Sequence, residues 1–193
     1  MEAWTEVNLV SARALDAALL LDVVDPIVHG ELSDEIETWF FFWEPDLRLR
    51  IRWNDPEHVE ENRRRLATTL ERAKKSRSIR RWYEGAHGAK GQTYVGEAEH
   101  YGAEAWPRIQ KDWMNGSELA LTLAKLDREG RLTRPHDYHW QRHVHLVTNQ
   151  LFGSWEAEIE LCLRQALGYL KLRGSATDEA ARLIAELRDF TAP

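Results

Sequence analysis

The chain has 193 residues and a net charge of −6, from 26 basic and 32 acidic side chains. This length fits one domain spanning residues 1–193, and the acidic balance disfavours direct binding of nucleic acid except through a local basic patch. The single Cys162 excludes an internal disulfide, and the lack of a bilayer-length apolar run or a signal peptide predicts a cytoplasmic protein without a membrane partner.

The beginning of the chain is predicted to be helical. Apolar residues recur at helical spacing over Glu6–Asp22, and Asp25-Pro26 is typical of a helix end. The next stretch, 26–32, is predicted to be a loop or a short extended piece, and Ser33 begins a turn. One helix is therefore expected before the first strand.

An aromatic run followed by an alternating segment predicts a hairpin. Trp39–Trp43 is typical of a strand, and Glu44-Pro45-Asp46 predicts a tight turn into Leu47–Trp53. Alternation in the second strand separates two faces, Leu47, Leu49 and Ile51 against Arg48, Arg50 and Arg52. Neighbouring guanidinium groups repel one another and lose hydration when covered, which indicates an anion-binding face. The alternative is a solvated arginine stripe paired with acidic residues of a neighbouring strand.

A charged helix and a glycine-rich connection follow the hairpin. The predicted helix covers His58–Tyr83, and we interpret its basic tracts as a solvated face. The glycines of Glu84–Gln92 indicate a flexible connection, typical of a mobile loop. Thr93–Gly102 is then predicted to be a strand or an extended segment.

Helices dominate the rest of the chain. Trp106-Pro107 opens a predicted helix that reaches about residue 126 and that Asn115-Gly116 is able to divide. The last predicted elements are a strand and two helices, over 140–148, 155–172 and 177–190. This order predicts an α+β fold in which helices pack over an antiparallel or mixed sheet.

The chemistry-bearing residues favour proton transfer over metal or nucleotide chemistry. A metal site among His136, Asp137, His139, His143 and His145 is an alternative, but no helical His-Glu-x-x-His pair is present and no third ligand is evident. The sequence also lacks a phosphate-binding loop, a dinucleotide-binding glycine pattern and a nucleophile elbow, so we expect no metal and no cofactor. Arginines, glutamates and a histidine suit a base that removes a proton while guanidinium groups stabilise an enolate or hold a carboxylate leaving group.

Three spaced blocks carry a family resemblance: Trp39–Phe42 running into Leu47–Arg50, Tyr94–Glu97 with Tyr101-Gly102, and His145 followed by Asn149–Gly153. They resemble the C-terminal domain of lantibiotic dehydratases, a family that includes stand-alone thiopeptide-type bacteriocin biosynthesis proteins. The blocks cover most of the chain, from about Trp39 to Gly168.

The resemblance implies that the chain modifies a ribosomally made precursor peptide. Elimination domains of this family remove glutamate from Ser or Thr side chains that a partner has glutamylated with glutamyl-tRNA, leaving dehydroalanine or dehydrobutyrine. A related branch joins two dehydroalanines into the pyridine ring of thiopeptides. Neither branch needs a metal. The implied partners are the precursor peptide and a separate glutamylating protein, while a homodimer stays open.

The resemblance also implies roles for individual residues. Arg48 and Arg50 match the paired arginines of the family and would bind the leaving glutamate or stabilise the enolate. Glu97 and His145 match a family glutamate and histidine, and His145 would be the proton-transfer residue. The residues expected to contact the substrate are Arg52, His100, Tyr101 and Asn149.

Three positions depart from the family pattern. Asp46 stands where the family has a histidine, and His100 and Gln150 stand where it has arginines. Because histidine holds a carboxylate as a cation only when protonated, His100 weakens the case for glutamate elimination. The alternatives are the pyridine-forming cyclase and a non-catalytic subunit that binds the peptide through an exposed aromatic groove.

Overall fold

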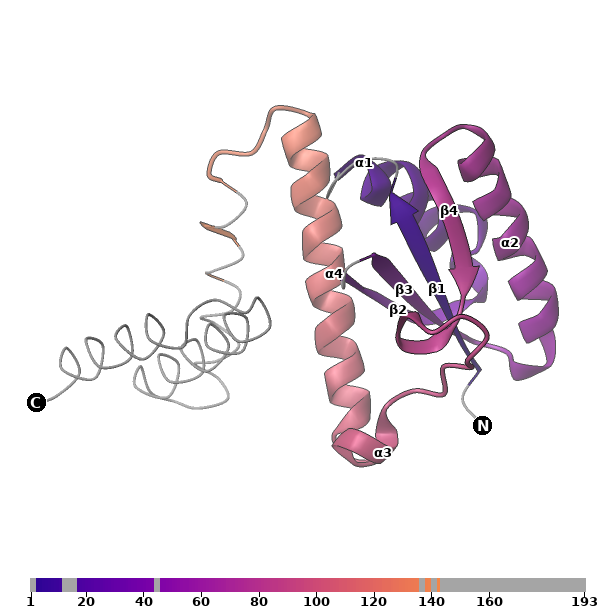
Figure 1. The fold of residues 1–193 in the computed structure, drawn as a ribbon. Helices are drawn as coiled ribbons and strands as arrows, with labels where there is room; N and C mark the ends of the chain where they lie inside the picture. The colour runs from indigo at the N-terminus through magenta and orange to yellow at the C-terminus, as the bar shows by residue number, and fades with distance from the viewer. Residues whose placement is uncertain (1–2, 12–16, 44–45, 136–137, 140–141, 143–193) are drawn as a thin grey trace, which may run out of the picture. The chain divides into compact units, whose positions relative to one another are not determined.

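A four-stranded antiparallel sheet, in the order β2-β3-β1-β4, organises the part of the chain that the computed structural model describes (Figure 1). The strands are β1 Trp4–Ser11, β2 Ile36–Trp43, β3 Leu47–Trp53 and β4 Ile79–Glu84. The α-helices are α1 Ala17–Leu19, α2 Val59–Lys75, α3 Ala98–Tyr101 and α4 Trp106–Arg128. The predicted α+β class is confirmed.

The described residues are 3–11, 17–43, 46–135, 138, 139 and 142. The chain divides into two compact units, Met1–Leu132 and Thr133–Pro193, and all the strands and helices named above lie in the first. Apart from Arg142, the strand predicted at 140–148 lies outside the described residues, as do the helices predicted at 155–172 and 177–190.

The predicted hairpin of β2 and β3 is confirmed. The two strands pair so that Phe40 lies opposite Arg50. Leu47, Leu49 and Ile51 are each 0% exposed, as expected when one face of a strand enters the core. Burying a side chain of this size contributes roughly 1.5–3 kcal/mol, so the alternation in β3 fixes which of its faces is covered.

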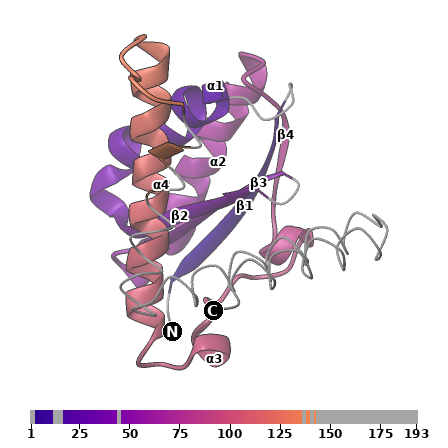
Figure 2. The same cartoon turned by 90° about the vertical axis from the view of Figure 1, so that its left-hand side faces the viewer.

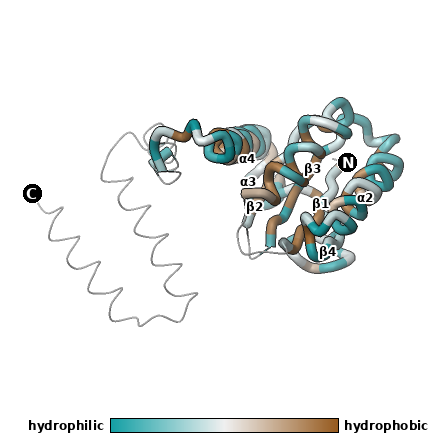
Figure 3. The backbone as a smooth tube through the Cα atoms, turned by 90° about the horizontal axis from the view of Figure 1, so that it is seen from above, coloured by the Kyte–Doolittle hydropathy of each residue, from teal (hydrophilic) through white to brown (hydrophobic). Residues whose placement is uncertain are grey.

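The two faces of the sheet carry separate apolar clusters. The face with the buried leucines of β3 packs against α1, against Leu66 and Leu70 of α2, and against two π-helical turns at Leu20–Val24 and Ile27–Glu31. The opposite face carries Arg48, Arg50 and Arg52, and we call it the arginine face. Its cluster consists of Trp4, Phe40, Ala86, Tyr94 and Trp106. Figure 3 shows the hydrophobic segments gathered in the strands and hydrophilic stretches along α2.

Helix α4 runs along the β2 edge of the sheet (Figure 2). Ser117 Oγ accepts a hydrogen bond from the backbone N–H of Phe41 at 3.1 Å, which satisfies a donor of the edge strand. Leu121 joins the leucine-face cluster and Trp106 joins the aromatic one. The helix is continuous through Asn115-Gly116, so one helix contributes side chains to the apolar clusters on both faces of the sheet.

The helix predicted over Glu6–Asp22 is wrong in its first part, which forms β1 between β3 and β4. Its strand pattern is concealed because Glu6 and Asn8, residue types that are rare in strands, are buried against partners far away in the chain. Among the described residues after β1, the backbone is helical from Ala17 on and over most of 26–32, which the sequence predicts to be a loop.

Two predictions after β3 are wrong in part. Helix α2 ends at Lys75, earlier than expected, because Arg77 adopts a left-handed φ of 64° and the chain then turns into β4. Thr93–Gly102 is not a strand and ends in the short helix α3. Gly96 and Gly102 flank this helix with φ of 83° and 85°. Glycine adopts such angles readily, so both positions redirect the chain toward α4.

Candidate functional site

Arg50 lies at the centre of the arginine face. Strand pairing places it between Glu6 of β1 and Phe40 of β2. The side chain of Arg50 is 4% exposed and that of Glu6 is 0% exposed. A buried charge is tolerated only when groups of opposite sign and good geometry surround it. The chain meets this requirement with carboxylates from two separate segments.

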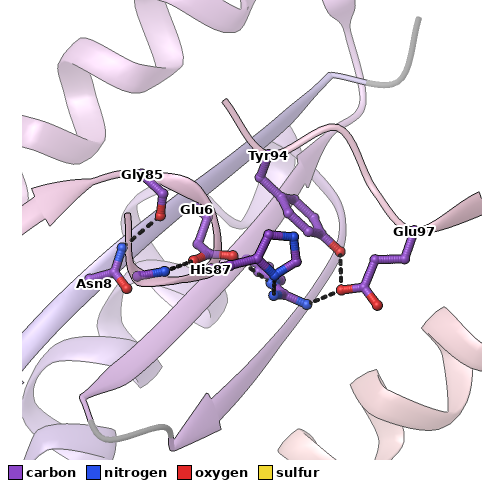
Figure 4. Close-up of polar contacts among 8 residues, drawn as sticks. Glu6, Asn8, Gly85, His87, Tyr94 and Glu97 are labelled. Carbon is purple, nitrogen blue, oxygen red and sulfur yellow. Dashed lines mark hydrogen bonds and ion pairs between the residues drawn. The ribbon is translucent and has the colours of Figure 1, made fainter. Parts of the chain in front are cut away.

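Each nitrogen of the Arg50 guanidinium has a partner (Figure 4). Nε donates to Glu6 Oε2 at 2.7 Å, and Nη1 donates to Glu97 Oε1 at 2.5 Å. Nη2 lies 3.3 Å from Nδ1 of His87. The guanidinium carbon lies 4.2 Å from the ring centroid of Tyr94, which adds a cation–π contact. The Tyr94 hydroxyl also donates to Glu97 Oε1 at 3.3 Å.

The glycine-rich stretch after β4 forms a hydrogen-bonded turn that brings His87 to Arg50. Asn8 Nδ2 donates to the carbonyl oxygen of Gly85 at 2.7 Å, and the backbone N–H of Gly88 donates to Glu6 Oε1 at 3.3 Å. A Cβ at Gly85 would lie 2.1 Å from a backbone carbonyl oxygen of the same turn. The stretch predicted as a flexible connection is thus anchored to β1 by side chains of the arginine face.

The phenols of Tyr94 and Tyr101 are both held in the protonated form. Burial raises the pKa of the Tyr94 hydroxyl far above its usual value. Burial and the nearby Glu97 carboxylate raise the pKa of Tyr101 as well. Both phenols therefore stay protonated near neutral pH and do not serve as bases. The groups available to hold an anion or move a proton are the Arg50 guanidinium, two carboxylates and the imidazole of His87.

Comparison with known proteins places the chain in a family. The family model for the lantibiotic biosynthesis dehydratase C-terminal region matches residues 4–190. The chain belongs to this family. Among solved structures, the tRNA-dependent lantibiotic dehydratase MibB from Microbispora sp. 107891 is similar at 20% identity with a TM-score of 0.53. The match covers 65% of this chain and 12% of the MibB chain, and it establishes a shared fold for that part. No curated protein matches the chain.

The other two arginines of β3 flank Arg50. Arg48 lies beneath the turn, since a Cβ added to Gly88 would be 3.3 Å from Arg48 Nη2. Arg52 forms an ion pair with Glu37 at 2.6 Å, and its guanidinium lies 5.8 Å from the ring centroid of Trp4. Arg48 therefore borders the group around Arg50, whereas Arg52 is engaged at the β2 side of the sheet.

His100 and Tyr101 follow Glu97 closely in the chain, and the backbone N–H of each donates to the Glu97 carbonyl oxygen at 3.0 Å. Both lie in α3, and their ring centroids are 4.6 Å apart. The Tyr101 ring stacks on Trp106 at 6.0 Å. His145 and Asn149, which the family pattern assigns to proton transfer and substrate contact, lie outside the described residues, and their roles stay predictions.

Three residues in contact with Arg50 carry no individual role in the sequence prediction. Glu6 falls in the stretch predicted to be helical, His87 falls in the glycine-rich connection, and Tyr94 belongs to a family block without an assigned function. The alternation of Val7 and Leu9 with Glu6 and Asn8 is a strand signal that the helical spacing of the same stretch outweighed in the sequence prediction. No comparable local pattern indicates His87, because its contact depends on the fold of the turn.

Within the part of the chain that the structure describes, no group of three or more His, Cys, Asp or Glu side chains is arranged to hold a metal ion. The same residues include no helix that is both long and apolar enough to cross a membrane. Four residues of the alternative metal site lie outside the described residues: His136, Asp137, His143 and His145.

Proposed function

We propose that this domain eliminates glutamate from glutamylated Ser or Thr residues of a precursor peptide. The observation that carries the proposal is the buried Arg50, which sits among carboxylates and an imidazole in a chain of the lantibiotic dehydratase family. A guanidinium in a place with little water attracts an anion much more strongly than one at the surface. The substrate of such a site is an acyl group that leaves as a carboxylate.

The proposed reaction breaks two bonds of the modified residue. A base removes the proton from its Cα, the electron pair forms the Cα–Cβ double bond, and the Cβ–O bond breaks to release glutamate. Arg48 and Arg50 stabilise the enolate that develops on the peptide carbonyl and bind the departing carboxylate. His145 is the proposed base. The product is dehydroalanine from serine or dehydrobutyrine from threonine.

Glu97 is the partner of Arg50 that a substrate carboxylate would replace. Its side chain is 16% exposed, whereas that of Glu6 is 0% exposed. Glu6 also accepts the backbone N–H of Gly88, which fixes it within β1 and the turn. When the substrate carboxylate takes the place of Glu97, Glu6 stays paired with Arg50, so the buried guanidinium always has a counter-ion.

A non-catalytic peptide-binding subunit is the second candidate. Arg50 and Arg52 already form ion pairs with carboxylates. These ion pairs favour a structural role for the two arginines over a role in binding a substrate. Val95 and Tyr101 are exposed at 64% and 38%, near Glu97 in sequence, and would offer an apolar contact for a peptide.

The proposed partners are the precursor peptide and a separate protein that glutamylates it with glutamyl-tRNA. The cytoplasm is the proposed site of action, because glutamyl-tRNA is used there. The thiopeptide-type cyclisation remains the alternative reaction within the family. It is recognised by its product, since it joins two dehydroalanines and releases no glutamate.

The test is incubation of the full chain with a synthetic peptide that carries a glutamylated serine, followed by mass spectrometry. We expect loss of glutamate from the wild-type reaction. Arg50→Lys should lower the rate by about 100-fold or more, because an ammonium cannot reproduce the forked hydrogen bonds of a guanidinium. Arg65→Lys is the matched control, since Arg65 is an exposed arginine of α2 paired with Glu35.

An intact adduct after incubation with the wild-type protein refutes elimination. Binding of the peptide without turnover then supports the accessory role. An Arg50→Lys rate equal to that of Arg65→Lys shows that Arg50 takes no part in the reaction.

A further inference from the structure

His87 occupies the solvent side of the buried guanidinium. The residue is exposed, whereas the side chain of Arg50 is 4% exposed, and the two meet through Nδ1 and Nη2 at 3.3 Å (Figure 4). The histidine ring also packs edge-on against Tyr94, with centroids 5.8 Å apart. A group that approaches Arg50 on this side therefore lies beside the imidazole.

The contact with Arg50 determines which ring nitrogen carries the proton. An arginine nitrogen has hydrogens to donate and no lone pair to accept with, so Nδ1 of His87 is the acceptor. In the neutral ring the proton then lies on Nε2. Among the described residues, Nε2 has no hydrogen-bond partner, which leaves this donor available to a ligand.

We propose that His87 donates its Nε2–H to the peptide carbonyl oxygen of the residue being modified. This inference rests on the proposed elimination, in which negative charge develops on that oxygen. Hydrogen bonds in a chain polarise one another, so a cation that donates to Nδ1 makes Nε2–H a stronger donor. Arg50 thus acts on the developing enolate through His87 as well as directly. No proton leaves His87 in this role.

The backbone supports a fixed position for the ring. His87 has φ of 51° and ψ of 32°, a left-handed conformation that non-glycine residues rarely adopt. Asn8 and Glu6 bind the turn on both sides of His87, through the carbonyl oxygen of Gly85 and the N–H of Gly88. A strained residue held in place by its surroundings is common where a side chain has a task to perform.

Two substitutions separate the contact with Arg50 from the proposed donor. His87→Asn keeps an oxygen near the position of Nδ1 and tolerates the left-handed backbone, but has no atom at the position of Nε2. His87→Gln places an amide N–H near Nε2. We expect His87→Asn to lower kcat for elimination by about 100-fold, with KM changed little, and His87→Gln to recover part of the loss.

Arg77→Asn is the matched control, since Arg77 is another non-glycine residue with a left-handed φ, of 64°, at the end of α2. It should leave elimination unchanged. Unfolding midpoints of all variants identify any loss of activity that comes from loss of structure.

The tautomer of His87 tests the inference without any turnover. In long-range ¹H–¹⁵N spectra of the wild-type protein without substrate, we expect Nε2 to be the protonated nitrogen of His87. Arg50→Lys should reduce this preference. A proton on Nδ1 overturns the inference, and so does a His87→Asn variant that eliminates as fast as the wild type. If the wild-type protein leaves the glutamylated peptide intact, the proposed elimination is refuted. The proposed hydrogen bond from Nε2–H to the carbonyl oxygen is then refuted as well, even when the proton is found on Nε2.

Discussion

The two carboxylates that bind Arg50 should differ sharply in their importance for stability. Glu6 uses both of its oxygens, since Oε2 accepts from Arg50 and Oε1 accepts from the N–H of Gly88. Glu97 receives Arg50 and the Tyr94 hydroxyl on the same oxygen, Oε1. An amide has one acceptor oxygen and one donor NH₂. Glutamine at position 97 can therefore accept both hydrogen bonds on its one oxygen. Glutamine at position 6 cannot, because its NH₂ group would face either the Arg50 guanidinium or the N–H of Gly88, and both are donors.

The size of the difference follows from burial. Removing one partner of a buried ion pair costs about 3–5 kcal/mol, and Glu6 is 0% exposed. Because Arg50 keeps Glu97 in the variant, we expect Glu6→Gln to lower the free energy of unfolding by about 3 kcal/mol. Glu97→Gln keeps its hydrogen bonds, leaves Glu6 on Arg50 and should cost about 1 kcal/mol.

Thermal and urea unfolding of the full chain, followed by tryptophan fluorescence, measure both variants. At roughly 2–4 °C per kcal/mol for a chain of this size, Glu6→Gln should lower Tm by about 6–12 °C and Glu97→Gln by about 2–4 °C. The urea m value should stay constant, because neither change alters the surface exposed on unfolding. Equal shifts, or a larger shift for Glu97→Gln, would refute the assignment of Glu6 as the fixed counter-ion.

Two further predictions concern elements away from Arg50. Burial opposes protonation of His29, but its hydrogen bonds to Asp25 and Glu118 outweigh burial and raise its pKa above 6.5. The stabilisation that the protonated imidazole gives is therefore complete below pH 6.5 and is lost as the pH rises through the raised pKa. The difference in Tm between wild type and His29→Gln should thus be steady below about pH 6.5 and shrink as the pH rises above it, and a difference that stays constant throughout would contradict this. Gly85→Ala forces a Cβ to within 2.1 Å of a carbonyl oxygen and should lower the urea midpoint, whereas Gly30→Ala, with nothing within 4 Å of its Cβ, should not.

The hairpin of β2 and β3 is the part of the fold that the sequence predicts best. Alternating leucine and arginine with an aromatic partner strand is a local pattern, and each step of it corresponds to a face of the sheet. The same pattern predicts that Arg50 and its neighbours share a face. It contains nothing about Glu6 or His87, because those contacts join β3 to residues that local patterns assign to other structures.

The errors have a common physical origin. β1 contains Glu6 and Asn8, which are unfavourable in an isolated strand, and tertiary partners compensate for both. β4 follows α2 after a single left-handed residue, Arg77, where a continuous charged pattern favours more helix. In each case tertiary contacts with residues distant in sequence outweigh the helix propensity of the segment itself.

The central place of β1 has a consequence for how the protein is made. Among the four strands, β1 is synthesised before both of its neighbours, β3 and β4, whose paired residues extend to Arg52 and Glu84. Until then the nascent chain holds Val7 and Leu9 without their cover. The sheet therefore forms around the strand that is synthesised first. A delay in translation before β4 would prolong the time during which an unpaired edge of β1 is exposed to chaperones and to other nascent chains.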